Sequence, residues 1–278
     1  MKDGAQVAVL VENNRTFLLS AVERAIERLR EGGFLVGHLG VVPARLGNHK
    51  GASVPLWYLR VFGFYDTGLL VLFSIVEALR RLRAHYGTER RSLSWVGLSR
   101  KLGLKCRFIT NPNSAESLEF LRASRCDILV ILVPYVLFSE VLAIPRIGAI
   151  NKHAAILPGC RGLFPFVWGT IHGLPLGVTL HKVTARVDAG PLLIQHRFEA
   201  GFSPRSMVEF YGHVFRLFPG MVVQAAESLL ARPAGMPQPT DAPNPYFGLP
   251  SRIHMKAFRA AGGRVIRAAD LMQPVGSE

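Results

Sequence analysis

The sequence predicts an α/β fold in which a doubly wound, mainly parallel sheet carries helices on both faces. Strand-like runs rich in Val, Ile and Leu alternate with segments whose apolar residues recur at helical spacing. Such alternation is typical of parallel strands joined by right-handed helical crossovers. The chain has 278 residues, of which 49 % are hydrophobic, so it can bury a sizeable core.

The first third of the chain predicts a strand, a helix and a second strand. Residues 6–11 are rich in Val, as expected for a buried strand. Residues 17–31 follow with a helical pattern carried by Leu18, Val22, Ala25, Ile26 and Leu29. Two glycines, Gly32 and Gly33, end that helix, and residues 34–42 predict the second strand.

The middle of the chain continues the same alternation. We expect a helix over 94–102, a strand over 105–109, a helix over 114–123 and a strand over 126–133. Ligands of doubly wound folds bind at the carboxyl ends of the strands, where Asn151 and His153 would fall.

Asn151, His153 and Asp188 have side chains that suit acyl-transfer chemistry. In an extended chain the period of two places Asn151 and His153 on one face, so a bound carbonyl would meet an amide donor and a proton carrier together. Asp188 lies in a Val-Asp-Ala-Gly turn and would fix the imidazole tautomer. His181, on a further expected strand, is interpreted as a structural or supporting residue.

At these positions the sequence resembles the folate-dependent formyltransferase family. The family pattern is Asn-x-His-x-Ser-x-Leu-Pro, Arg-Gly, Gly-Val-Thr and Asp-x-Gly. It is met by Asn151, His153, Leu157, Pro158, Arg161, Gly162, Gly177, Val178, Thr179, Asp188 and Gly190. The resemblance is strong over about 125–196. Within the family, the sequence is most similar to the methionyl-tRNA and amino-sugar branches. Two positions depart from the pattern, because Ala155 replaces the usual Ser and Cys160 replaces an aromatic residue.

The resemblance implies transfer of a formyl group from 10-formyltetrahydrofolate to a primary amine, without a metal. It implies that Asn151 stabilises the oxyanion, His153 moves protons and Asp188 orients His153. Arg161 and Gly162 would bind the substrate, although Arg161 could equally hold its loop through backbone carbonyls. The apolar walls expected around the pterin are Val136, Leu137, Phe138, Leu157, Pro158 and Val187.

The resemblance also implies a domain organisation. Residues 1–200 would form the catalytic domain, with a helical insertion at about 43–92, and residues 201–278 would pack on it as a helical and extended region. In that region we expect a helix over 204–230 with a break or kink at Pro219, a Pro-rich linker over 231–245 and extended chain over 244–252.

The insertion concentrates aromatic and basic residues between 54 and 86. On a helix, Leu69, Leu72, Phe73, Val76 and Leu79 would share one stripe, with Arg80, Arg81 and Arg83 near its end. Such a helix suits an anionic membrane surface, and it also suits a hairpin buried against the domain or against a second copy in a homodimer. The pattern favours a buried hairpin, packed against the domain or against a second copy, over the membrane surface, which stays open.

The net charge of the chain and two missing sequence features bear on the identity of the amine acceptor. The formal charge of +14, from 33 basic and 19 acidic residues, favours anionic partners such as nucleotide sugars, anionic lipid or nucleic acid. The segment after the first strand has no phosphate-cradling glycines, and the last thirty-odd residues leave no room for an appended β-barrel. We therefore expect a nucleotide-linked or lipid-linked amino sugar, and regard specific nucleic-acid binding as disfavoured. Initiator methionyl-tRNA, hydrolysis of the donor and a non-catalytic basic membrane adaptor are the alternatives.

Cysteine usage and the N-terminal residues indicate a cytoplasmic protein, with the inner face of the membrane as a second expected location. Cys106, Cys126 and Cys160 are widely spaced and predict neither a disulfide framework nor a zinc site. The apolar run near the N-terminus is too short for an export signal.

Overall fold

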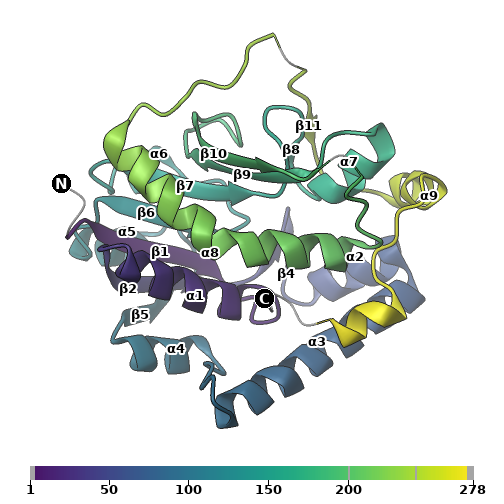
Figure 1. Ribbon diagram of the computed structural model, residues 1–278, viewed down its shortest axis with the longest axis horizontal. Helices are drawn as coiled ribbons and strands as arrows, with labels where there is room; N and C mark the ends of the chain where they lie inside the picture. Colours follow the sequence, from purple (N-terminus) through teal and green to yellow (C-terminus); the bar gives the residue numbers. More distant parts are fainter. Residues whose placement is uncertain (1–3, 200, 242, 274–278) are drawn as a thin grey trace.

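A seven-stranded sheet forms the centre of the protein, whose computed structural model describes residues 4–199, 201–241 and 243–273 (Figure 1). The strand order is β10-β9-β7-β6-β1-β2-β5. Strands from β7 to β5 pair in parallel, whereas β9 is antiparallel to both of its neighbours. The strands are β1 (Gln6–Glu12), β2 (Leu35–Val42), β5 (Lys105–Phe108), β6 (Ile128–Leu132), β7 (Gly148–His153), β9 (Gly177–Lys182) and β10 (Leu192–Arg197). The expected mainly parallel α/β fold is confirmed.

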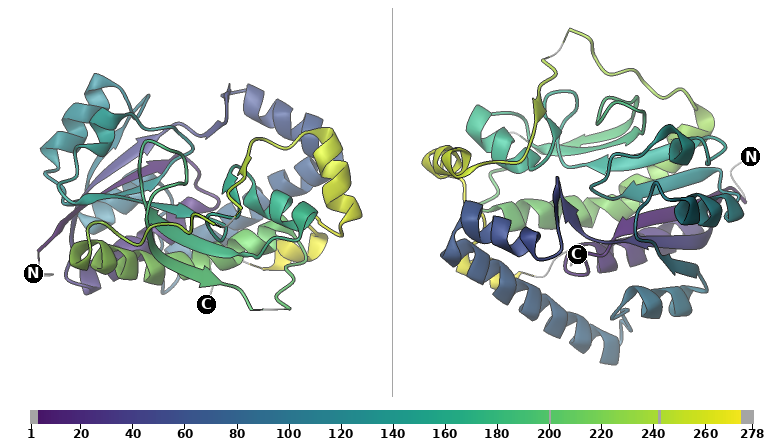
Figure 2. Two further views of the ribbon diagram at one scale, coloured as in Figure 1. Left: turned by 90° about the horizontal axis from the view of Figure 1, so that it is seen from above. Right: turned by 180° about the vertical axis from the view of Figure 1, so that it is seen from behind.

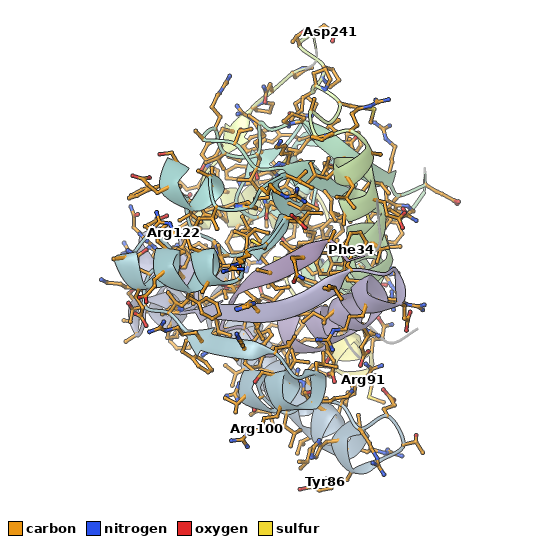
Figure 3. All side chains as sticks on the ribbon, turned by 90° about the vertical axis from the view of Figure 1, so that its left-hand side faces the viewer. Phe34, Tyr86, Arg91, Arg100, Arg122 and Asp241 are labelled. Carbon is orange, nitrogen blue, oxygen red and sulfur yellow. The ribbon has the colours of Figure 1, made fainter. Side chains whose placement is uncertain are left out.

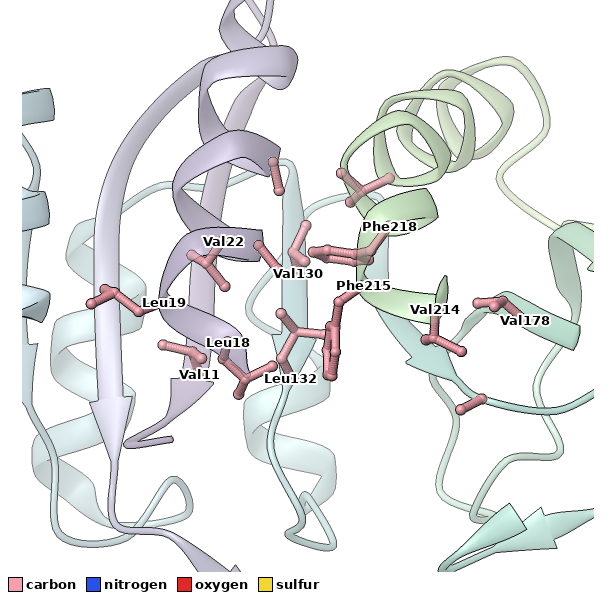
Figure 4. Close-up of a cluster of buried hydrophobic side chains, with 14 of the residues drawn as sticks. Val11, Leu18, Leu19, Val22, Val130, Leu132, Val178, Val214, Phe215 and Phe218 are labelled. Carbon is pink, nitrogen blue, oxygen red and sulfur yellow. The ribbon is translucent and has the colours of Figure 1, made fainter. Parts of the chain in front are cut away.

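Helices cover both faces of this sheet. On one face α1 (Leu18–Glu31) and α8 (Met207–Ala231) lie side by side, and Figure 4 shows Leu18 and Val22 of α1 near Phe215 and Phe218 of α8, above strand β6. On the other face α5 (Ala115–Ala123) and α6 (Ser139–Leu142) cover a separate cluster of buried apolar side chains. Because both faces are buried, β6 is apolar and buried throughout.

Further short strands and helices complete the fold. A small hairpin, β3 (Arg45–Leu46) and β4 (His49–Lys50), leads into α2 (Ser53–Phe62) and α3 (Phe64–Tyr86), and α4 (Trp95–Leu102) precedes β5. A second small sheet pairs β8 (Arg161–Gly162) with β11 (Tyr246–Phe247) in parallel. The other helices are α7 (Pro165–His172), α9 (Arg252–Ala260) and the 3-10 helix η1 (Ala268–Met272).

Pro219 lies inside α8 without ending the helix. The helix is continuous from Met207 to Ala231, and Figure 1 shows its two halves meeting at an angle, which fits a kink and not a break. By length and composition alone, this helix could cross a membrane. However, Val214, Phe218 and Val222 are fully or almost fully buried in the core, so here α8 acts as a core helix.

The α2–α3 insertion forms an arm along one side of the protein (Figures 1 and 2). Trp57, Phe62 and Phe73 are buried against the rest of the chain. The predicted stripe of α3 does not act as one buried face, because Leu72 and Leu79 are 43 % and 61 % exposed. The outward-facing part of α3 is therefore apolar.

Candidate active site

The antiparallel pairing of β7 with β9 brings together the polar side chains at the carboxyl edge of the sheet. Asn151 pairs with His181, and His153 pairs with Thr179. Residues directly opposite each other in an antiparallel pair have neighbouring side chains on the same face. The period of two along each strand therefore collects Asn151, His153, Thr179 and His181 in one place.

Asp188 joins these residues from the turn that follows β9. Its carboxylate lies 3.5 Å from His153 Nδ1 and 3.5 Å from His181 Nε2. The amide nitrogen of Asn151 is 3.3 Å from His181 Nε2. Asn151, His153, His181 and Asp188 thus form a connected cluster, which we call the polar cluster.

The two ring nitrogens of His153 have different partners. Nε2 donates to the carbonyl of Cys160 at 2.6 Å, which leaves Nδ1 of the neutral ring free to accept a proton. Burial lowers the pKa of His153, although Asp188 and the Cys160 carbonyl act in the opposite direction. The ring is therefore neutral at pH 7, and a proton taken up at Nδ1 would face the Asp188 carboxylate.

Asp188 is held as an anion in an unusual backbone conformation. Burial opposes its ionisation, but His153, His181 and the backbone amide of Gly162 outweigh this effect and hold the pKa of Asp188 well below its ordinary value. Gly162 N–H donates to the carboxylate at 2.9 Å. The φ angle of Asp188 is +50°, which few non-glycine residues adopt. Such strain is common where a side chain is positioned for function.

Glycines of the formyltransferase pattern stand where backbone segments approach closely. A Cβ atom at Gly162 would lie 2.0 Å from the carbonyl oxygen of Phe247, and one at Gly190 would lie 1.8 Å from that of Lys182. No side chain fits at either position. These contacts fix the turn that carries Asp188 and the strand β8, whose Gly162 amide donates to the Asp188 carboxylate.

Thr179 and Gln195 hold the loop that follows β7. The buried Thr179 hydroxyl donates to the Ala155 carbonyl at 2.6 Å and accepts from the Leu157 amide at 3.3 Å. Gln195 donates to the Leu157 carbonyl at 2.9 Å and to the Thr179 hydroxyl at 3.0 Å. The loop therefore keeps its conformation although Ala155 has no hydroxyl of its own.

A cavity of about 1010 Å³ opens beside the polar cluster and is lined by Asn151, His153, Gly162 and Asp188. Of the residues expected around a pterin, Val136, Phe138 and Val187 line this cavity. The others, Leu137, Leu157 and Pro158, are buried and do not line it. Asn113 supports the apolar wall, because its side chain donates to the Val136 carbonyl and accepts from the Phe138 amide.

Arg161 uses its guanidinium within the chain. It donates to the carbonyl of Val187 at 3.4 Å and to that of Asn244 at 3.0 Å. The side chain does not line the cavity. Of the two expected roles, this geometry favours holding the loop through backbone carbonyls.

A second part of the cavity contains ionisable groups that the sequence did not single out. Glu12, Tyr58, Lys152 and Tyr211 all line it. Burial raises the pKa of Glu12 to about 7 and lowers that of Lys152 to about 8. The Lys152 ammonium lies 4.4 Å from the centre of the Phe215 ring. We call these four residues the inner polar wall; buried groups with shifted pKa values concentrate at functional sites.

A mainly parallel α/β sheet with this polar cluster at its carboxyl edge defines a site suited to acyl transfer. Residues 109–205 match the formyl transferase family model. No group of three or more His, Cys, Asp or Glu residues able to hold a metal ion occurs in the described part of the chain.

Curated relatives include methionyl-tRNA formyltransferases and a polymyxin resistance protein. The methionyl-tRNA formyltransferase of Chlorobium limicola is 37 % identical over 95 residues, which are 34 % of this chain and 30 % of the relative. The bifunctional polymyxin resistance protein ArnA of Wigglesworthia glossinidia brevipalpis is 28 % identical over 145 residues, 49 % of this chain and 22 % of the relative. The chain thus spans less than a third of the length of these relatives.

Solved structures share the fold at low sequence identity. A sugar N-formyltransferase from Shewanella sp FDAARGOS_354 superposes with a TM-score of 0.52 at 16 % identity, covering 88 % of this chain and 77 % of that one. A phosphoribosylglycinamide formyltransferase from Streptococcus pneumoniae also gives 0.52 at 16 % identity, covering 83 % of this chain and 99 % of that one.

The lowered pKa of His153 predicts the pH dependence of any reaction in which the neutral ring acts as a base. A base is active when unprotonated, so activity should fall as the pH drops through its pKa. Since that pKa lies below the ordinary value of 6.5, the rate at saturating substrate should stay constant through pH 6.5 and fall only below it. Asp188→Asn removes the charge that favours the protonated ring, so it should move the fall to still lower pH. An acidic limb at or above 6.5, unmoved by Asp188→Asn, would contradict the assignment.

Proposed function

We propose that this protein transfers a formyl group from 10-formyltetrahydrofolate to a primary amine. The observation that carries the proposal is the polar cluster, in which Asn151, His153 and Asp188 converge beside a cavity within the segment that matches the family. His181 completes the cluster between Asn151 and Asp188.

The chemistry assigns a distinct task to each residue. The acceptor nitrogen attacks the formyl carbon of the donor, and a tetrahedral intermediate with a negatively charged oxygen forms. Asn151 donates a hydrogen bond to that oxygen, a contribution of roughly 3 kcal/mol for donors of this kind. The new carbon–nitrogen bond is kept, the bond to folate N10 breaks, and the amine proton passes to N10 by way of His153.

The surroundings of His153 support its role as a proton carrier. The neutral ring has one acceptor, the Cys160 carbonyl, whereas the protonated ring would have a second in Asp188. The positive charge that forms on the ring during transfer is thus stabilised without rearrangement of Asp188. Asp188 acts as a positioning residue in this scheme.

Apolar and polar parts of the cavity fit the two substrates. Val136, Phe138 and Val187 supply a wall for the flat pterin of the donor. The inner polar wall supplies a carboxyl, an ammonium and two phenol groups for a hydroxylated acceptor. Together with the charge of +14, this wall supports an amino sugar linked to a nucleotide or a lipid. We propose a cytoplasmic enzyme.

The acceptor can be identified by supplying 10-formyltetrahydrofolate with separate acceptors. We expect tetrahydrofolate and a formamide product with a nucleotide-linked or lipid-linked amino sugar, and no transfer to initiator methionyl-tRNA. Mass spectrometry of the acceptor and absorbance of the released folate measure the two products together.

Three other outcomes would change the proposed reaction or the proposed acceptor. Tetrahydrofolate and free formate without a formamide would indicate hydrolysis of the donor. Efficient formylation of methionyl-tRNA, with a rate that falls steeply as salt increases, would replace the sugar acceptor with a nucleic acid. Absence of any folate product with every acceptor would leave a non-catalytic protein.

A further inference from the structure

Helix α3 turns many of its apolar side chains to the solvent, although Phe73 is buried, and it turns several polar side chains to the protein. Thr67, Glu77 and Arg81 are buried on the inner face. Glu77 pairs with Arg80 at 2.6 Å, and Arg81 donates to the Arg15 carbonyl at 2.5 Å. The exposed large apolar residues of the helix are Phe64, Tyr65, Val71, Leu72, Ile75, Leu79, Leu82 and Tyr86.

This orientation is the reverse of that of a helix on a water-exposed surface. From Leu72 to Tyr86 the exposed apolar residues recur every three or four positions, so they form one continuous face along this part of the helix. A contiguous apolar face of this kind marks an interaction site in a soluble protein. The packing of α3 against its own domain, which buries the polar face, leaves the apolar face unused.

Basic residues surround the end of this face. At the turn between α2 and α3, a groove against α9 is lined by the exposed apolar residues Leu56, Phe64 and Ile253. The same groove contains Arg60, Arg252, Lys256 and Arg259, and no acidic residue of the described chain lines it. Asp66 lies nearby but is paired with Arg259 at 2.7 Å.

We propose that the outer face of α3, with the groove between α2 and α9, binds the surface of an anionic lipid bilayer. Exposed apolar side chains would enter the boundary between headgroups and acyl chains, while Arg60, Arg252 and Lys256 would contact lipid phosphates. Tyr65 and Tyr86, near the two ends of α3, have the amphipathic rings that favour this boundary.

Charge favours the bilayer over a second copy of the chain. In a two-fold dimer the same surface meets itself, so the cationic groove would face an equally cationic one unless the contact were confined to α3. An anionic bilayer instead neutralises each basic residue of the groove.

Flotation of the whole protein with lipid vesicles tests this proposal. We expect the protein to float with vesicles of phosphatidylcholine and phosphatidylglycerol in equal amounts, and to remain below vesicles of phosphatidylcholine alone. Binding should weaken as salt increases, because salt screens the basic residues from the lipid phosphates.

Two pairs of substitutions separate the apolar and the basic contributions. Ile75→Gln with Leu79→Gln removes apolar contacts, and Arg252→Glu with Lys256→Glu reverses charge; each pair should lower vesicle binding by about tenfold or more. All four side chains are exposed, so the fold should persist, as circular dichroism can verify.

Matched controls use exposed residues away from this surface. Leu35→Gln with Val96→Gln, and Arg122→Glu with Arg197→Glu, should leave vesicle binding unchanged. Figure 3 shows Arg122 far from Tyr86, which marks the end of α3.

Three outcomes would overturn the proposal. The protein could fail to float with either kind of vesicle, or it could float equally well with both pairs of substitutions in place. It could also sediment as a dimer that Ile75→Gln with Leu79→Gln converts to monomers, in which case a second copy covers α3. None of these outcomes depends on formyl transfer, which is assayed separately with a water-soluble amino sugar.

Discussion

His153→Ala should lower formyl transfer by about 10²–10⁴-fold, the contribution typical of a positioned acid or base. The His153 imidazole lies against the Asp188 carboxylate and the Cys160 carbonyl and also lines the cavity. His181 has similar partners in Asp188 and the Lys182 carbonyl but does not line the cavity, so it should not replace His153 as the proton carrier. Donor affinity should change little, because the ring acts after the donor is bound.

Single-turnover rates and the affinity for tetrahydrofolate, measured on the same variant, separate these two effects. His196→Ala is the matched control, since His196 is exposed on β10 and lies outside the cavity. Transfer by His153→Ala at a rate near that of the wild type would remove the proposed mechanism. A large loss of tetrahydrofolate affinity would instead indicate that the ring supports the donor site.

Gly162→Ala should strongly destabilise the fold around the site. The new Cβ would lie 2.0 Å from the Phe247 carbonyl oxygen, and the φ angle of +100° is unfavourable for alanine. Strain and overpacking together should destabilise the fold by about 2–5 kcal/mol. The amide of Gly162 would also move away from Asp188, so transfer should fall even below the unfolding temperature.

Thermal unfolding and transfer rates can be measured beside Gly212→Ala. Gly212 lies within helix α8 with no atom within 4 Å of the added Cβ, so that substitution should stabilise the fold by about 0.5–1 kcal/mol. Equal stability of the two variants would show that β8 and β11 can move apart without lowering the free energy of unfolding. That result would also contradict the close approach that positions Asp188.

Local patterns in the sequence predict the sheet and three members of the polar cluster, Asn151, His153 and Asp188. Apolar periodicity indicates the strands and helices, and the period of two along β7 places Asn151 and His153 together. The function of His181 depends on a different kind of information, namely the antiparallel register between β7 and β9. A sequence shows that Thr179 and His181 share a face, but not which strand they oppose.

The inner polar wall and the outer face of α3 also could not be predicted from local patterns, because both depend on contacts between segments that are far apart in the sequence. Glu12 and Lys152 come from different strands, and their shifted pKa values result from burial beneath other segments. On α3, periodicity finds the apolar residues but cannot show which side of the helix meets the domain. Buried partners such as the Arg15 carbonyl decide that, because they attract Arg81 inward.

The alternation of side chains along β7 has a consequence for folding accuracy. Ile150 is buried in the core, Asn151 and His153 belong to the polar cluster, and Lys152 lies between them on the opposite side of the strand. A shift of β7 by one residue would turn Ile150 out of the core and move His153 away from Asp188 at once. Misaligned molecules would therefore be too unstable to accumulate, so the fraction of correctly folded chains and the fraction of competent sites should be equal in any preparation.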